Sequence, residues 1–338
     1  MDMLTIRRPD DWHLHLRDGA MLLAVAPASR DVGRAIVMPN LVPPVVTGDH
    51  ARAYRDRIVA AGFARPLMTL YLTEDTDPAE VVAAHRDGTV TAVKLYPAGA
   101  TTNSASGVRN MDAVRPVLAA MEEAGVPLCI HGEVVDGDVD IFDREAAFLG
   151  HVLAPLVDAH PTLRITLEHV TTRAAVDFVR GHDGIGATIT VQHLMMDRND
   201  LLAGGLRPHN YCLPVLKRRG DREALREAAT SGDPRFFLGT DSAPHPTHAK
   251  EAACCAAGCF TAPLAIAAYA TVFDGMGALD RFEAFASLNG PAHYGLPPND
   301  DTITLRRGPP AERDGPTDPP VTVWTPPIPL TWHVEAVA

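Results

Sequence analysis

Short runs of apolar, β-branched residues recur along the chain and alternate with longer, alanine-rich amphipathic stretches. Runs of this length and composition predict strands, and the stretches between them predict helices, several of them closed by a glycine that suits a helix C-terminus. We predict eight strands, at residues 11–17, 33–40, 65–73, 91–97, 126–133, 164–170, 185–190 and 235–244.

Eight strands that alternate with helices are the pattern of a (β/α)8 TIM barrel, so we predict an α/β protein with this fold. An open, doubly wound sheet is the alternative, but the glycine-rich GxGxxG turn of such folds is missing after the first predicted strand. A length of 338 residues also allows two domains. Barrels of roughly 250 residues or more are nevertheless common as one domain.

The composition changes near residue 297, where the chain becomes rich in proline, glycine and charged residues before the final segment VTVWTPPIPLTWHVEAV. Proline-rich tracts do not form central strands of a sheet. We therefore predict a barrel domain over residues 1–296. Residues 297–338 are expected to form a proline-rich linker and a C-terminal extended segment that packs on the barrel.

The charge of the chain excludes some classes of partner. Lys and Arg number 30 against 42 Asp and Glu, a formal net charge of −12. A nucleic acid or an anionic membrane would favour a basic excess, so we expect neither as a partner. The N-terminus lacks the apolar stretch of a signal peptide, which predicts a cytoplasmic protein.

Five cysteines, an odd number in a long chain, also fit a reducing compartment better than a disulfide framework. Cys254, Cys255 and Cys259 lack the paired spacing of a zinc knuckle. We interpret these three as small buried residues of a helix.

Polar residues fall where the predicted strands end, which is where barrel enzymes place their chemistry. His13 and His15 are two apart on the first strand and therefore share a face. A structural role explains each such residue, taken alone, as well as metal binding does. Several nitrogen and oxygen ligands together at one rim, however, suit Zn²⁺. The other candidates, at the ends of the fourth, fifth, sixth and eighth strands, are Lys94, His131, His169 and Asp241.

Lys94 stands inside the apolar run TAVKLYP, where an unpaired ammonium would be costly. Two interpretations remain open. One is an ion pair with Asp241 or with a glutamate. The other is carboxylation of the lysine, because a carbamate can bridge two metal ions whereas an ammonium cannot ligate a cation.

Several motifs together resemble those of the dihydroorotases of enteric bacteria and yeast, within the amidohydrolase superfamily: DWHLHLRD, IVMPN, KLYP, HGE, LEHVTT, YCLPVLKR and GTDSAPH. The resemblance extends from about residue 5 to about residue 297. It implies a homodimeric enzyme with a small-molecule substrate. The implied reaction is the reversible cyclisation of N-carbamoyl-L-aspartate to L-dihydroorotate in pyrimidine biosynthesis.

The resemblance also implies two Zn²⁺ ions per subunit. Lys94, as N6-carboxylysine, would bridge the two ions together with a hydroxide. Asp241 would be the catalytic general base that later protonates the departing amide nitrogen. The implied ligands are His13, His15 and Asp241 for the buried ion and His131 and His169 for the more exposed ion.

The same resemblance implies how the substrate is held. A guanidinium fork such as that of Arg17 suits a carboxylate. Thr101 and Thr102, in the small-residue loop PAGATTNSASG, would close over the substrate as a lid. Gly99 stands where enteric relatives have asparagine, so we expect a looser lid. The implied substrate-binding residues are Arg17, Asn40, His131, Leu213, His245 and Ala257.

Other functions remain open from the sequence. A hydantoinase or an allantoinase would use the same metal ligands with a different pocket, and Arg17, Asn40 and His245 argue against it. A mononuclear deaminase would not need Lys94. A barrel that serves only as a binding scaffold would lack one or more ligands, and none is missing. His193, near the seventh strand, is expected to have a structural role.

Overall fold

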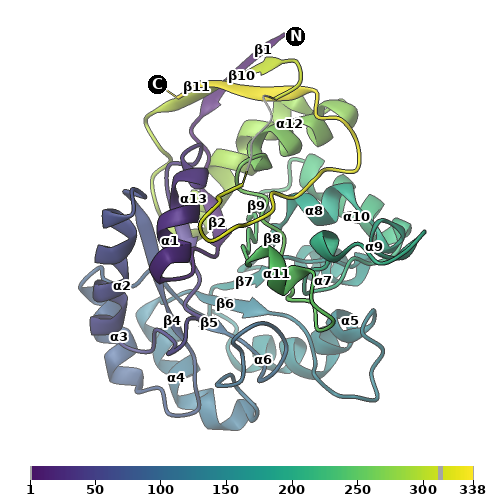
Figure 1. The fold of residues 1–338 in the computed structure, drawn as a ribbon. Helices are drawn as coiled ribbons and strands as arrows, with labels where there is room; N and C mark the ends of the chain where they lie inside the picture. Colours follow the sequence, from purple (N-terminus) through teal and green to yellow (C-terminus); the bar gives the residue numbers. More distant parts are fainter. Residues whose placement is uncertain (1, 311–314, 338) are drawn as a thin grey trace.

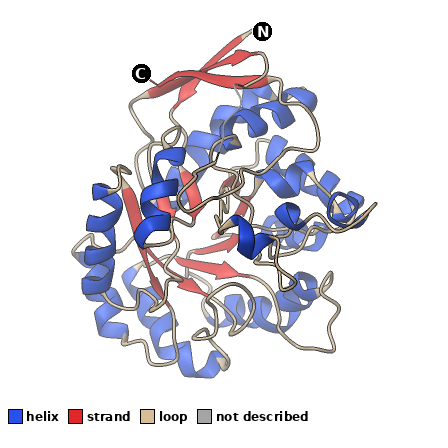
Figure 2. Ribbon diagram, in the orientation of Figure 1, coloured by secondary structure: helices blue, strands red, loops and turns tan. Residues whose placement is uncertain are grey.

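The computed structural model describes residues 2–310 and 315–337. Eight parallel strands follow one another in chain order, and helices surround them (Figures 1 and 2). Each strand overlaps one of the predicted segments, so the predicted (β/α)8 fold is confirmed. The barrel strands are β2 (Asp11–Leu14), β3 (Ala35–Val37), β4 (Pro66–Tyr71), β5 (Ala92–Leu95), β6 (Leu128–His131), β7 (Ile165–Glu168), β8 (Ile185–Ile189) and β9 (Phe236–Leu238).

The barrel strands are buried on both faces. Every residue of β5, β6 and β7 is buried, because one face of each strand lines the barrel interior and the other lies under helices. The apolar runs in the sequence follow from this environment. The few polar residues inside these strands therefore need a partner within the barrel.

The helices follow from amphipathic patterning and end signals. In α4 (Met111–Ala124) the buried positions Val114, Val117, Leu118 and Met121 recur at helical spacing. The Asn110 side chain accepts a hydrogen bond from the Asp112 N–H at the start of this helix. The helix ends at Gly125, whose φ of 71° suits glycine.

The remaining helices connect the barrel strands or cover the end of the chain. Short π-helical turns at Leu149–Leu153 and Ala284–Leu288 join α5 to α6 and lead into α13. The α-helices are α1 (Gly19–Val25), α2 (Gly48–Ala60), α3 (Pro78–Arg86), α5 (Arg144–Phe148), α6 (Ala154–Ala159), α7 (Arg173–Gly181), α8 (Val191–Met195), α9 (Arg198–Leu202), α10 (Arg219–Thr230), α11 (Thr247–Lys250), α12 (Ala265–Gly275) and α13 (Asn289–Tyr294).

The barrel closes between β2 and the segment that follows β9. Leu14 and Ser242 form a parallel bridge, and the Asp241 N–H donates to the His13 carbonyl at 2.9 Å. A Cβ at Gly239 would lie 2.7 Å from the Thr188 side chain, so the close approach of the strands requires glycine. The closing seam therefore brings the His13 and Asp241 backbones together.

A second sheet joins the two ends of the described chain. It is antiparallel, with β10 (Thr302–Arg307) between β1 (Met3–Arg7) and β11 (Trp332–Val337), and it lies at the top of Figure 1. Sequence analysis predicts an extended segment for β11 but no strand for β1 or β10. Trp324 and Trp332 are buried, so the C-terminal segment packs on the molecule.

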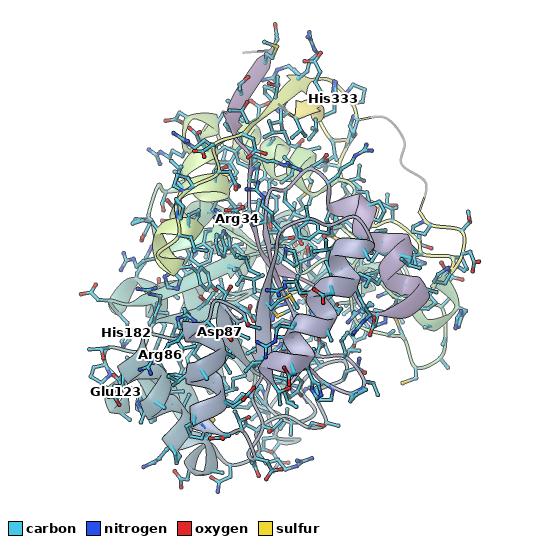
Figure 3. The ribbon with its side chains drawn as sticks, turned by 90° about the vertical axis from the view of Figure 1, so that its left-hand side faces the viewer. Arg34, Arg86, Asp87, Glu123, His182 and His333 are labelled. Atoms are coloured by element: carbon cyan, nitrogen blue, oxygen red, sulfur yellow. The ribbon has the colours of Figure 1, made fainter. Side chains whose placement is uncertain are left out.

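A buried polar cluster closes the N-terminal end of the barrel. Arg34, labelled in Figure 3, donates to both carboxylate oxygens of Asp10, at 3.1 and 2.5 Å, and to the Pro297 carbonyl at 2.9 Å. Asn299 donates to Asp10 at 2.7 Å. The segment that follows the last helix is thereby attached to the barrel end opposite the predicted site.

The three clustered cysteines were predicted to be buried helix residues; burial is confirmed for Cys259 alone, and the prediction of a helix is wrong. Cys254 is exposed, Cys255 is half-buried, and all three lie outside the helices. This irregular segment contains Gly258, whose φ of 148° and close approach to the Ala243 carbonyl, 2.4 Å from where a Cβ would stand, require glycine. Within residues 2–310 and 315–337, no helix has the length and apolar character needed to cross a bilayer.

Candidate metal centre

The six predicted metal-binding side chains lie together at the C-terminal ends of the barrel strands. All are buried, with exposed fractions from 0% for Lys94 to 8% for His15. Parallel strands place their carboxyl ends at one rim, so residues far apart in the sequence meet there. The six are His13 on β2, His15 after β2, Lys94 on β5, His131 on β6, His169 after β7 and Asp241 after β9.

His13, His15 and Asp241 point ligand atoms at one another. The two Nε2 atoms of His13 and His15 are 3.2 Å apart. Asp241 Oδ1 lies 3.4 Å from Nε2 of His13 and 3.2 Å from Nε2 of His15. The donor set and its spacing suit a divalent cation with nitrogen and oxygen ligands.

His169 links this trio to His131. The His169 ring centroid is 4.9 Å from that of His13 and 4.7 Å from that of His131. His13, His169 and Asp241 each offer a ligand atom within 4.8 Å of the others. The histidines therefore form one continuous cluster.

Three residues of the site adopt left-handed backbone conformations that non-glycine residues rarely use. The φ angles are 59° for Arg17, 43° for His169 and 45° for Asp241. Such conformations concentrate at functional sites, where the surrounding structure holds them against their local cost. Asp241 in this conformation donates its backbone N–H to the His13 carbonyl at 2.9 Å.

Burial sets the protonation of the cluster. It lowers the pKa values of His13, His15 and His169 well below their ordinary value, and the nearby Lys94 adds to the effect. The imidazoles are therefore neutral at pH 7, which is the form that binds metals. Burial also lowers the pKa of Lys94 to about 7 and raises that of Asp241 to about 7.

Three buried carboxylates, which sequence reasoning missed, surround the cluster: Asp11, Glu133 and Glu168. Asp11 accepts hydrogen bonds from the His13 N–H at 3.1 Å and from the N–H and hydroxyl of Thr240 at 2.8 and 2.6 Å. It thus fixes the seam that precedes Asp241. Each carboxylate is next to, or two residues from, a predicted ligand in the sequence, which is the signal that could have found it.

Glu133 and Glu168 contact the predicted ligands themselves. Glu133 Oε2 lies 2.8 Å from Nε2 of His131. Glu168 Oε1 lies 3.1 Å from Nδ1 of His13, and its Oε2 contacts Nζ of Lys94. The lysine buried in an apolar run is therefore paired with a glutamate, one of the partners that the sequence left open.

The predicted substrate-binding residues line one side of this rim. Arg17 Nη2 lies 3.0 Å from His245 Nε2, which lies 2.9 Å from the Ala257 carbonyl. Arg17 also donates to the Pro244 carbonyl at 3.0 Å. Burial, the main cause, together with the cation of Arg17, lowers the pKa of His245 to about 3, so Arg17 carries the positive charge here.

The predicted lid loop reaches the same residues. Asn40 donates to the Thr102 carbonyl at 2.9 Å, and the Thr102 hydroxyl donates to the Ala257 carbonyl at 3.5 Å. Thr101 instead bonds within the loop, to Ser104. Gly99 has a φ of 86°, a conformation that glycine adopts freely and that asparagine tolerates better than most residues.

Leu213 and His193 lie on the neighbouring side. Leu213 is half-buried and follows Cys212, and the preceding Tyr211 carbonyl accepts from the Gly258 N–H at 2.9 Å. His193 lies 2.7 Å from the Thr190 hydroxyl and 2.9 Å from the Pro214 carbonyl. Both ring nitrogens of His193 are thus engaged in the fold, as expected for a structural residue.

Comparisons with known proteins show the family of this chain. The model of the amidohydrolase family matches residues 11–304. A dihydroorotase of Ruegeria pomeroyi is 65% identical over 98% of both chains. The chain belongs to the amidohydrolase family, among its dihydroorotases.

Solved structures lead to the same family. Dihydroorotase of Saccharomyces cerevisiae in complex with 5-fluoroorotic acid superimposes with a TM-score of 0.92, at 33% identity and 99% coverage of both chains. An L-hydantoinase of Arthrobacter aurescens superimposes with a TM-score of 0.82 over 99% of this chain and 84% of its own, at 15% identity. The second likeness concerns the amidohydrolase fold alone.

Proposed function

We propose that this chain catalyses the reversible cyclisation of N-carbamoyl-L-aspartate to L-dihydroorotate and water, a step of pyrimidine biosynthesis. The observation that carries the proposal is the meeting of the histidine and aspartate cluster with Arg17, Asn40 and His245 at one barrel rim, in a member of the dihydroorotases. The cluster supports amide chemistry, and the guanidinium supports binding of a free carboxylate.

We infer that the centre binds two zinc ions per subunit. The donor set fits, because the imidazoles are neutral and the side chains already point at one another. When bound, such ions lower the pKa of water and polarise an amide carbonyl. Lys94 is proposed to join the ions as N6-carboxylysine. The proposed ligands are His13, His15 and Asp241 for one ion and His131 and His169 for the other.

Asp241 is proposed to move the proton of the reaction. Its Oδ1 lies within 3.4 Å of two histidine nitrogens at the centre of the cluster. A carboxylate there accepts a proton from water during ring opening and returns it to the departing amide nitrogen. The carboxylate is held by the backbone bond to His13, so the proton-carrying atom stays beside the cluster.

The substrate carboxylate is proposed to bind at Arg17, with Asn40 and His245 beside it. His131 and the backbone groups of Leu213 and Ala257 are proposed to contact the rest of the ring. The contacts of the Thr102 hydroxyl with Ala257, and of Asn40 with the loop, support a lid that closes with Thr101 and Thr102 over the ring and excludes water.

We also propose that the enzyme is a cytoplasmic homodimer. Sedimentation of the purified chain would test the second part, because a dimer has twice the 36.2 kDa mass of one chain. Sedimentation at the mass of a single chain would contradict it.

A panel of substrates distinguishes the proposed dihydroorotase activity from hydantoinase and allantoinase activity. The purified protein is assayed with dihydroorotate, hydantoin and allantoin, beside metal analysis of the same sample. We expect ring opening of dihydroorotate to exceed that of the other two, because those rings lack the carboxylate that Arg17 would bind. Preferential opening of hydantoin or allantoin would contradict the proposal.

A further inference from the structure

Glu168 lies beside the histidine cluster and contacts two of the proposed ligands at once. It is the last residue of β7, and its side chain is completely buried. One carboxylate oxygen lies 3.1 Å from Nδ1 of His13, and the other contacts Nζ of Lys94. No other described residue contacts both of these side chains through its carboxylate.

We propose that Glu168 is a positioning residue that orients His13 and Lys94 toward the metal centre. The inference rests on the proposed function, because it concerns how the chain prepares the proposed ligands. A carboxylate behind a ligating histidine fixes both its tautomer and its ring orientation. Here Nδ1 of His13 faces Glu168 and Nε2 faces His15 and Asp241, so a proton held on Nδ1 leaves Nε2 free to ligate.

The second oxygen of Glu168 does the same for Lys94. Addition of CO₂ to the neutral amine forms an N–C bond, releases one proton and leaves one hydrogen on Nζ. That N–H can donate to Glu168, which turns the new anionic group away from the glutamate and toward the histidines. The same carboxylate can therefore pair with the ammonium form of Lys94 and orient its carboxylated form.

Glu133 is a useful comparison for Glu168. It contacts one proposed ligand through one carboxylate oxygen, whereas Glu168 contacts two proposed ligands through both of its oxygens. Glu133 Oε2 lies 2.8 Å from His131 Nε2, and among the described residues Glu133 has no ion-pair contact with a second imidazole or with an ammonium group, whereas Glu168 contacts both His13 and Lys94. A glutamine at 133 keeps one acceptor for one donor. A glutamine at 168 has one carbonyl oxygen, which can accept from either His13 or Lys94. Its NH₂ group would then face the remaining donor, with which it cannot form a hydrogen bond.

The experiment compares full-length wild type with Glu168→Gln and Glu133→Gln. Zinc retention is measured by competition with a chelator. Carboxylation is followed by the carbamate carbon signal after incubation with ¹³C-bicarbonate. Glu122→Gln is the control, because Glu122 also lies against a histidine, His160, at 2.9 Å, but at the far end of α4.

We expect Glu168→Gln to weaken zinc retention by about tenfold to a hundredfold, the range found for such supporting carboxylates, and to reduce the carbamate signal. Glu133→Gln should weaken zinc retention less and keep the carbamate signal, and Glu122→Gln should match wild type. Wild-type zinc retention and carbamate signal in Glu168→Gln, or equal losses in both active-site variants, would overturn the inference.

A replacement variant and a separate activity assay complete the experiment. If Glu168→Gln does not fold, Glu168→Asp replaces it; its shorter side chain cannot reach both partners, so the same losses are expected. Activity of wild type on dihydroorotate is recorded separately. A wild type that binds zinc and is carboxylated but inactive contradicts the proposed function, while the difference between the variants still decides the role of Glu168.

Discussion

At the scale of single residues, the site depends on groups whose ordinary charge is changed by burial. Histidines buried among a lysine and other imidazoles stay neutral and can ligate, and burial also lowers the pKa of Lys94 to about 7. Lys94 is thereby brought toward the neutral amine that reacts with CO₂. An arginine at this position would remain protonated and could not be carboxylated.

Lys94→Ala should reduce ring-opening activity to background, because the proposed bridge between the two metal ions is lost. Added short carboxylic acids such as acetate or propionate should restore part of the activity by supplying a carboxylate in the vacated space. The measurement is the rate with each acid against the same ionic strength of chloride. Full activity of the untreated variant would contradict the role given to Lys94.

Arg17→Met tests the carboxylate site separately from the metals. Loss of a charged hydrogen bond of about 1.5–3 kcal/mol should raise KM for N-carbamoyl-L-aspartate by roughly 10- to 150-fold. Bound zinc should fall much less than substrate binding, because the short contacts of Arg17 are with Pro244 and His245, at 3.0 Å each, and its contact with Nδ1 of the proposed ligand His15 is long, at 3.5 Å. Zinc loss in proportion to the loss of binding would instead indicate a structural residue.

The sequence marks the candidate ligands at the strand ends, which the structure brings into one cluster, but we did not predict the buried carboxylates that contact them. His13 and His15 share a strand face, and Lys94 is conspicuous in an apolar run, so their chemistry is visible in the sequence. The signal for Glu168 and Asp11 is weaker, because it is only their closeness in sequence to a predicted ligand, and a carboxylate beside a histidine is equally common on a surface. Their roles depend on contacts with residues far away in the sequence, such as Lys94 and Thr240.

At the scale of elements, the barrel strands were predictable and the second sheet was only partly so. Strands buried on both faces appear as apolar runs, and all eight were found on this basis. β1 and β10 are partly exposed, and they pair residues such as Met3 and Arg306 from opposite ends of the chain. A local pattern does not contain that pairing.

The second sheet makes a testable contribution to stability. Trp332 in β11 is fully buried, with the Arg307 guanidinium 4.7 Å from its ring centroid. Trp332→Ala should lower the free energy of unfolding by about 3–5 kcal/mol, as expected for a large buried side chain. Urea denaturation checks this against Ile328→Ala, which is 49% exposed and should change it by about 0.5 kcal/mol or less. A loss below about 1 kcal/mol for Trp332→Ala would contradict the packing described here.

His193 links α8 to the segment at Pro214 and gives the fold a predictable pH dependence. Burial, the main cause, lowers its pKa to about 3, below the value of about 6.5 in the unfolded chain. The unfolded state therefore binds the extra proton as the pH falls below about 6.5, and stability is lost in that direction. Between about pH 8 and about pH 5 the loss from this residue is about 2 kcal/mol.

His193→Gln should remove this part of the pH dependence, whatever its effect on stability at neutral pH. Urea unfolding of wild type and variant at both pH values gives the difference directly. Wild type should lose about 2 kcal/mol more than the variant on acidification. Equal losses in the two proteins would contradict a buried, neutral His193.

At the scale of the whole molecule, the acidic surface and the proposed anionic substrate are compatible. The formal net charge is −12, yet N-carbamoyl-L-aspartate carries two carboxylates. Local positive charge decides binding in a buried site, and bound cations are often the largest charges there. Arg17 and the proposed metal ions would supply that charge at the rim, so net charge restricts the class of partner without restricting the substrate.

The central claim is that this barrel opens and closes the dihydroorotate ring with a metal centre built on Lys94. The most direct test is the rate of dihydroorotate ring opening by the full chain, measured against bound zinc as a chelator removes it and zinc is returned. The account predicts activity that falls and recovers with zinc and reaches its maximum near two ions per chain. Undiminished activity in the zinc-free protein, or no activity in the fully loaded protein, would contradict it.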